Sequence, residues 1–184
     1  MNKLGSTVTA VIGAAVGTAL VATTGSAVAA TSTFQDAQGD MAHGADILSA
    51  KVVNEKNVRV VLQVEDLVRS YKSGAAVTVY LDTDPADAGP EFAFLGGMFE
   101  GTDYGLVRTE GWKVGDHPRV VRGFHIMKLD YENDVARFRM TRGALDNPGK
   151  VRVAIKTSGE QNDGDIVHDW LQDRRDFTPW VKRG

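Results

Sequence analysis

The stretch that decides the fold runs from Ala76 to Phe94 and reads AVTVYLDTDPADAGPEFAF. In its first half the residues alternate, so that Val77, Val79 and Leu81 fall on one side of an extended chain. The alternation ends at Asp82, in an acidic turn, and a second apolar run follows. This pattern predicts a buried strand that leads into a carboxylate-rich loop and then into a second strand.

The same period of two recurs along most of the chain. Segments 47–53 and 58–64 flank a polar turn and predict a hairpin, and segments 120–129 and 135–140 predict another. Further strands are predicted at 33–36, 104–109 and 150–157, and the only weak helical patterns lie at 66–72 and 167–175. About eight strands without βαβ alternation predict an all-β fold, an antiparallel β-sandwich of jelly-roll type, with a closed barrel as the alternative.

The first thirty residues predict a secretory signal peptide. Lys3 precedes an apolar run over residues 8–21, and small residues follow up to Ala29 and Ala30, after either of which cleavage is expected. A retained membrane anchor is the alternative. We therefore expect a secreted protein with one β-sandwich domain at residues 31–184 and no stable membrane span after cleavage.

Composition removes several classes of chemistry. The chain has no cysteine, which excludes disulfides, thiol nucleophiles and zinc–thiolate sites. Residues 31–104 hold 12 Asp and Glu against 5 Lys and Arg, whereas residues 105–184 hold 12 against 15. Neither half contains a concentrated basic run, so we expect no nucleic-acid partner.

Aspartates in two loops form the candidate metal site. Hard cations such as Ca²⁺ take six to eight oxygen ligands, often from irregular loops at strand ends. The alternative is that these residues only form turns, because an Asp side chain readily accepts a hydrogen bond from the backbone two residues further on. The candidate ligands, which one structural Ca²⁺ would join, are Asp36, Asp40, Asp46, Asp82 and Asp84.

Two aromatic residues are the candidate ligand-binding side chains. Trp112 lies in a glycine-flanked loop and Tyr104 begins the strand before it, and exposed rings can stack on the C–H face of a sugar. Trp170 and Trp180 are expected to pack instead.

The C-terminal tail allows three readings. Asp163, Asp165 and Asp169 could form a second cation loop, and His168 with Asp169 could form an acid–base pair. We favour a structural tail that folds back over the sandwich, since neighbouring residues on a strand point to opposite faces.

No catalytic motif is present: the sequence lacks a Gly-x-Ser-x-Gly elbow, a His-Glu-x-x-His motif and a Walker loop. A glycoside hydrolase with a carboxylate pair is the enzymatic alternative. Asp82, Glu100 and Asp103 are its candidate residues, because the required separation is spatial rather than sequential.

Several short motifs together suggest a family. The run Asp36-x-x-Gly-Asp40, the pair Asp46-Ile47, the segment 79–84 (VYLDTD) and the late pair Asp169-Trp170 resemble small secreted β-sandwich proteins of actinobacteria. More distantly, the chain is similar to family 9 carbohydrate-binding modules and DOMON-like domains.

The resemblance implies a jelly-roll sandwich, in some members a structural calcium, and a sugar or a haem as ligand. The acidic positions match in type, whereas the paired stacking tryptophans of the sugar-binding modules have no clear counterpart. A haem would need an axial Met/His pair, for which Met98, Met127 and His125 are the available residues.

The sequence thus predicts a secreted, non-enzymatic binding domain for carbohydrate or another cell-envelope component, with a structural calcium. The alternatives are the carboxylate-pair hydrolase and a structural or partner-binding envelope protein.

Overall fold

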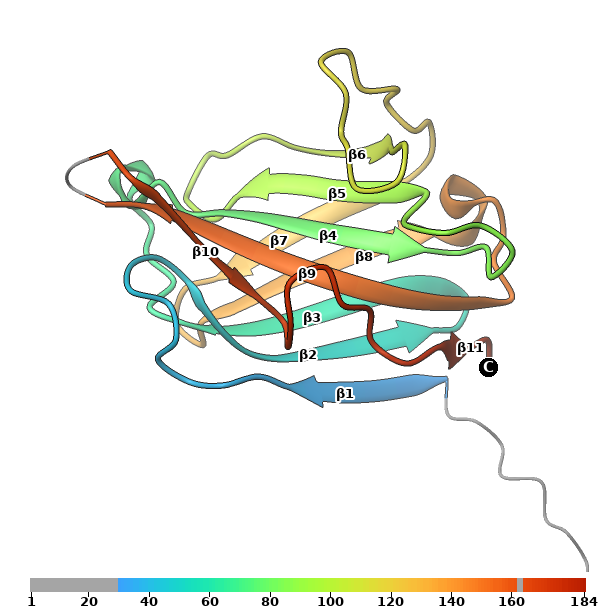
Figure 1. The fold of residues 1–184 in the computed structure, drawn as a ribbon, viewed down its shortest axis with the longest axis horizontal. Helices are drawn as coiled ribbons and strands as arrows, with labels where there is room; N and C mark the ends of the chain where they lie inside the picture. The colour runs from blue at the N-terminus through green and yellow to red at the C-terminus, as the bar shows by residue number, and fades with distance from the viewer. Residues whose placement is uncertain (1–29, 162–163) are drawn as a thin grey trace, which may run out of the picture.

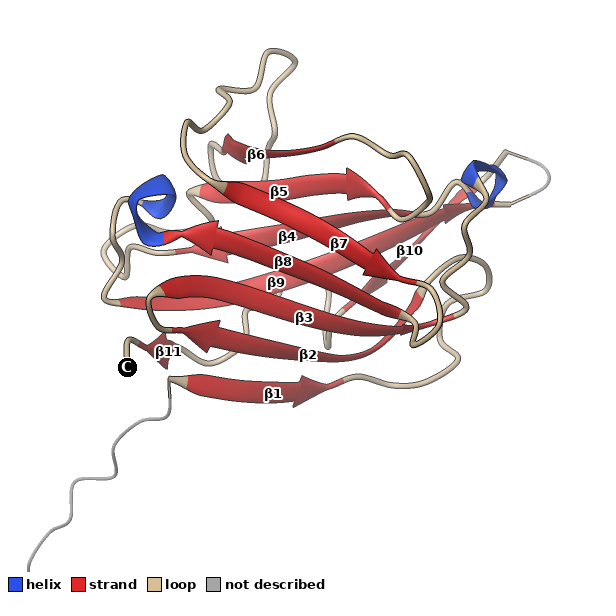
Figure 2. Ribbon diagram, turned by 180° about the vertical axis from the view of Figure 1, so that it is seen from behind, coloured by secondary structure: helices blue, strands red, loops and turns tan. Residues whose placement is uncertain are grey.

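Two antiparallel β-sheets packed face to face make up the computed structural model, which describes residues 30–161 and 164–184 (Figures 1 and 2). In spatial order, the first sheet contains β1 (Thr31–Gln35), β2 (Asp46–Asn54), β3 (Asn57–Glu65), β8 (Val135–Thr141) and β7 (His125–Asp130). The second contains β10 (Ile166–Trp170), β9 (Lys150–Glu160), β4 (Ala76–Asp82), β5 (Phe92–Gly97) and β6 (Tyr104–Arg108), and β11 (Val181–Lys182) pairs with β9. The predicted all-β sandwich is confirmed.

The chain passes from one sheet to the other between β3 and β4, between β6 and β7, and between β8 and β9. Two short 3₁₀ turns, η1 (Tyr71–Ser73) and η2 (Arg142–Leu145), lie in two of these connections. The weak helical pattern at 167–175 is wrong, because β10 pairs there with β9 from Ile166 to Trp170. No described helix has the length and apolar character needed to cross a membrane.

The stretch from Ala76 to Phe94 forms the centre of the second sheet. Val77, Val79 and Leu81 of β4 are fully buried in the core between the sheets, where Phe94 of β5 and Phe138 of β8 meet edge to face at 5.2 Å. Burial of this many apolar side chains is the main stabilising contribution to such a fold.

The other side of β4 is covered as well. Tyr80 is only 8% exposed because the loop that carries Trp112 and the C-terminal segment around Trp170 and Phe177 pack over it. The expected tail therefore does fold back across the second sheet, and its last strand, β11, pairs with β9. Residues 1–29, which contain the predicted signal peptide, and Asp163 lie outside the described residues.

Candidate cation and ligand site

Three carboxylates converge at one end of the sandwich. Asp40 lies in the loop between β1 and β2, Asp46 begins β2, and Asp169 belongs to β10 of the opposite sheet. One oxygen from each lies within 4.8 Å of the others. Asp46 and Asp169 are 4% and 5% exposed, so two of the three acids are buried.

Backbone N–H groups fix the orientation of this cluster. The Asp46 carboxylate accepts hydrogen bonds from the backbone nitrogens of Gly39 and Met41, at 2.7 and 3.0 Å, which folds the 36–46 loop around it. One oxygen of Asp169 accepts a hydrogen bond from the Ile47 nitrogen at 2.7 Å. All three donors lie in the loop before β2 or in β2 itself, so main-chain groups of the first sheet orient both Asp46 and the Asp169 carboxylate of the second sheet.

Asp36 adds a fourth carboxylate nearby. One of its oxygens accepts a hydrogen bond from the Gln172 nitrogen at 2.8 Å, whereas the other is buried without a hydrogen-bond partner. Burial raises the pKa of Asp36, and the charges of Asp40 and Asp46 raise it further.

The crowding of negative charge changes the acidity of the cluster. Burial raises the pKa of Asp169 to about 6, against the hydrogen bond from Ile47, and the charges of Asp36, Asp40 and Asp46 add to the increase. The pKa of Asp40 is also raised, first by burial and then by its hydrogen bond to Asp46.

No Lys, Arg or His among the described residues forms an ion pair with any of these four acids. Buried carboxylates are normally paired, protonated or bound to a metal, because an isolated buried charge is strongly unfavourable. The arrangement can therefore hold a divalent cation among its oxygens or share a proton between its acids.

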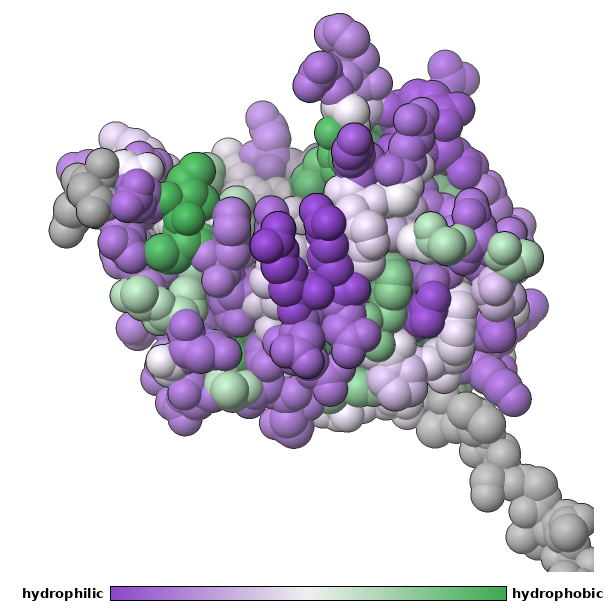
Figure 3. Space-filling model, viewed as in Figure 1, coloured by the Kyte–Doolittle hydropathy of each residue, from purple (hydrophilic) through white to green (hydrophobic). Residues whose placement is uncertain are grey.

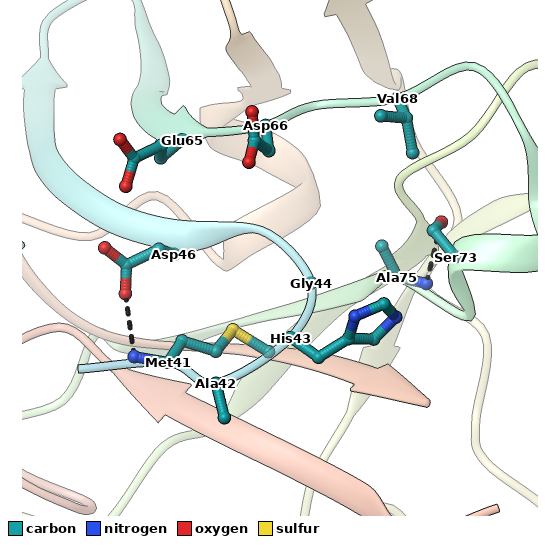
Figure 4. Close-up of a pocket in the computed structure, with 10 residues that line it drawn as sticks. All are labelled: Met41, Ala42, His43, Gly44, Asp46, Glu65, Asp66, Val68, Ser73 and Ala75. Atoms are coloured by element: carbon teal, nitrogen blue, oxygen red, sulfur yellow. Dashed lines mark hydrogen bonds between the residues drawn. The ribbon is translucent and has the colours of Figure 1, made fainter. Parts of the chain in front are cut away.

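A polar hollow of about 480 Å³ opens beside the cluster (Figure 4). One wall consists of the loop residues from Met41 to Gly44, with Asp46 at its end. The other carries Glu65, the last residue of β3, and then Asp66 and Val68. Ser73 and Ala75 close one end, toward which the His43 ring points. Asp46 thus belongs both to the carboxylate cluster and to the lining of the hollow.

The second acidic segment does not reach this site. Asp169 lies opposite Thr157 of β9, whereas Asp82 lies opposite Arg152, five residues away on the same strand. At 3.3 Å per residue this separates them by about 17 Å. The structure therefore does not bring the two predicted segments to one ion, because β4 runs away from the end of the sandwich where the cluster lies.

Asp82 and Asp84 have other partners. Asp82 is fully buried, and Arg152 pairs with it through two nitrogens at 2.6 and 2.7 Å. Burial raises the pKa of Asp82, and Arg152 opposes that increase. Asp84 accepts a hydrogen bond from the Ala86 nitrogen at 2.9 Å, the local turn that was the alternative reading of this segment.

The two predicted stacking residues lie on opposite faces of the second sheet. Trp112 is half-buried on the outer face, with its ring 4.8 Å from Phe177 and 5.1 Å from Tyr80. Tyr104 is 40% exposed and stacks at 5.8 Å on Phe94, which points into the core. They cannot form one sugar-stacking platform, and on the face that bears β10 and β9 hydrophobic residues form only small groups (Figure 3).

The remaining candidates are scattered. Glu100 forms an exposed ion pair with Arg69, and Asp103 is exposed, whereas Asp82 is fully buried beside Arg152. Met98 and Met127 are buried in the core, and His125 packs against Phe94. These positions do not single out a catalytic pair or a pair of haem ligands.

Sequence reasoning missed the partners that complete the site. Asp169 was considered only with its chain neighbours, although its nearest acids lie more than 120 residues earlier. The sequence pattern places Glu65 just after the predicted strand 58–64 and Asp66 at the start of the weak helical pattern 66–72. Nothing in that pattern showed that both residues face the 41–46 loop across a hollow. The positive φ of Asp66 (58°) marks an unusual turn, but it is visible only in the structure.

No family model matches the chain, and a comparison with curated proteins finds no match.

Proposed function

We propose that this protein is a secreted, non-enzymatic binding domain that takes a neutral, hydroxyl-rich ligand such as a carbohydrate in the hollow beside Asp46, and that a calcium ion in the carboxylate cluster supports that hollow. The observation that carries the proposal is the double position of Asp46. Its carboxylate belongs to the cluster, holds the 39–41 backbone and ends the hollow's loop wall.

Calcium fits the donor set. All the side-chain donors are carboxylate oxygens, which hard cations prefer, and main-chain carbonyls of the same loop and water can complete the six to eight ligands. A soft metal would favour sulfur or imidazole. The two buried acids, with no ion-pairing partner among the described residues, supply the charge that a divalent cation would neutralise.

The hollow fits a ligand that donates hydrogen bonds. Asp46, Glu65 and Asp66 can each accept from hydroxyl groups, and Ser73 and His43 add polar contacts. Three carboxylates would repel an anionic ligand. The ring of Tyr71, which is 69% exposed in the same 3₁₀ turn as Ser73, is a candidate stacking surface that the sequence pattern did not indicate.

The calcium part is tested by thermal unfolding at pH 7.5 with calcium or with a chelator. We expect calcium to raise the melting temperature of the wild type, through binding to the folded state alone, and to leave that of Asp169→Asn nearly unchanged. Asp103→Asn removes the same charge from an exposed position and should respond as the wild type does. An identical melting temperature with and without calcium would refute the calcium site.

The carbohydrate part is tested on a glycan array in the presence of calcium, followed by titration calorimetry with any glycan that binds. Asp66→Asn is the informative variant, because Asn tolerates the left-handed backbone at this position. Loss of a charged hydrogen-bond acceptor is expected to weaken binding about tenfold or more, and Asp103→Asn should bind normally. Failure of the wild type to bind any neutral glycan would refute the ligand class and leave the calcium result unaffected.

A further inference from the structure

The outer face of the first sheet, which is turned toward the viewer in Figure 2, gathers exposed cations from four neighbouring strands. We call this set the basic face. Its members are Lys51 of β2, Arg59 of β3, Arg137 and Arg139 of β8, and Lys128 of β7.

The strand register places these cations in two rows across the sheet. Arg59 lies directly opposite Arg139, and Arg137 lies directly opposite Lys128. Lys51 shares the second row, because it lies opposite Val61, which in turn lies opposite Arg137. The rows are two residues apart along the strands, which is about 7 Å.

Like charges directly opposite each other destabilise a sheet, and acids only partly compensate here. Glu55 pairs with Arg59 at 2.8 Å and Asp130 pairs with Arg137 at 3.0 Å. None of the other three cations forms an ion pair with a described acid. Five cations and two acids leave this face net positive on a chain whose formal net charge is −3.

A shallow groove of about 220 Å³ follows the same residues. Val61 and Ile126 contribute apolar surface to it, and the side chains of Arg59, Lys128, Arg137 and Arg139 surround that surface. Phe124, 48% exposed, extends the apolar strip, and the Arg139 guanidinium lies 4.8 Å from its ring centre. The groove therefore combines apolar contact surface with a rim of positive charge.

We propose that the basic face binds an anionic polysaccharide, whose sulfate or uronate groups pair with the cations while its sugar rings lie on the strip formed by Val61, Ile126 and Phe124. Arginine suits this role, because its planar guanidinium can bind a carboxylate or a sulfate through two nitrogens. The site differs from the acidic hollow in sheet, charge and ligand, so neither proposal depends on the other.

Two other polyanions are less well matched. An anionic lipid surface would be contacted by apolar side chains that project beyond the charges, whereas Val61 and Ile126 are half-buried within the groove. A single-stranded nucleic acid would stack successive bases on several exposed aromatic rings, whereas Phe124 is the one exposed ring that the described residues place beside this groove.

The test measures binding of the complete mature chain to dextran sulfate and to polygalacturonate, with neutral dextran as control, in a chelating buffer of low ionic strength. We expect the wild type to bind both charged polymers and not the neutral one. Affinity should fall steeply as NaCl rises from about 0.05 to about 0.5 M, since bound counterions are released on association.

The informative variant combines Lys128→Gln with Arg139→Gln, because neither residue belongs to the two ion pairs and the sheet should keep its circular dichroism spectrum. Its affinity should fall about tenfold, with a shallower salt dependence. The matched control, Lys113→Gln with Arg174→Gln, removes the same charge from exposed loop positions away from this sheet and should bind as the wild type does.

Three results would overturn the proposal. They are failure of the wild type to bind either charged polysaccharide, an equal loss in the Lys113/Arg174 control, and tighter binding to a single-stranded oligonucleotide or to anionic phosphatidylglycerol vesicles at equal charge concentration. Asp66→Asn in the hollow should bind the charged polymers normally, which separates this site from the one proposed above.

Discussion

Asp169 of β10 accepts a hydrogen bond from the backbone nitrogen of Ile47 in β2 at 2.7 Å, a contact between the two sheets across 122 residues of sequence. The same carboxylate faces Asp40 and Asp46. One side chain therefore both joins the sheets and carries a charge that its surroundings disfavour, and the following two predictions depend on that conflict.

Replacement of Asp169 by Asn should stabilise the cation-free protein. The amide keeps an oxygen for Ile47 but removes one of the mutually repelling charges, so we expect the free energy of unfolding in chelator at pH 7.5 to rise by about 1–3 kcal/mol. Urea denaturation measures this change. In saturating calcium the order should reverse, because the variant loses a ligand. An Asn variant that is less stable than the wild type in chelator would contradict the predicted repulsion.

The titration of Asp169 should also appear in the pH dependence of the unfolding free energy measured in chelator. Because the pKa of Asp169 in the folded state, about 6, lies above its ordinary value of 3.8, the folded state binds more protons between these pH values. The proton bound by Asp169 therefore stabilises the folded state by up to about 3 kcal/mol. This stabilisation is complete below pH 4 and is lost as the pH rises through 6. The measurement is the difference in unfolding free energy between the wild type and Asp169→Asn at pH 4 to 8. A difference that does not change with pH would contradict the raised pKa.

Gly159→Ala should displace the 41–44 wall of the hollow, against which Gly159 packs. A methyl group at this position of β9 would lie 2.9 Å from the Gly44 Cα and closer still to the His43 carbonyl oxygen. Backbone contacts this short force the 41–44 wall to move, so we expect weaker calcium binding and a lower melting temperature. Calcium titration followed by thermal unfolding checks both. Gly143→Ala, which has open space around it, is the matched control and should leave both unchanged.

Arg152→Ala should be among the most damaging single changes. It leaves the fully buried Asp82 without its ion partner and removes the guanidinium that lies 4.6 Å from the rings of both Phe177 and Trp180. We expect a loss of about 3–5 kcal/mol in chemical denaturation. Asp82→Asn combined with Arg152→Ala should lose less than Arg152→Ala alone. A double variant as unstable as the sum of both single variants would show that the two residues act independently.

Local sequence predicted much of the fold. The period of two located β3, β4, β8 and β9, because a strand with one buried face must alternate. The pattern wrongly indicated a helix at 167–175, because the polar residues of the short edge strand β10 hide the alternation. The predicted strand 120–129 was also longer than the observed β7 (His125–Asp130), since Val120 and Phe124 before the strand are exposed loop residues.

The candidate site was predicted only in part. Asp36, Asp40 and Asp46 do gather at one end of the sandwich, as expected for a short loop between two strands. Asp82 had the same local character, yet it belongs to an ion pair at the opposite end of β4. Composition and spacing do not distinguish these cases, because both are aspartates that follow or precede a strand.

Alternation and composition are local properties, and they were enough to predict an all-β chain without cysteine chemistry. The choice between a two-layered sandwich and a closed barrel came from the packing of the two sheets. Which charges meet follows from the folded chain as a whole. The pairing of β10 with β9 brought Asp169 to Asp40 and Asp46, and the register of β3, β8 and β7 collected scattered cations into the basic face. Such contacts depend on strand order and register, which are set by the packing of the whole core rather than by any one segment.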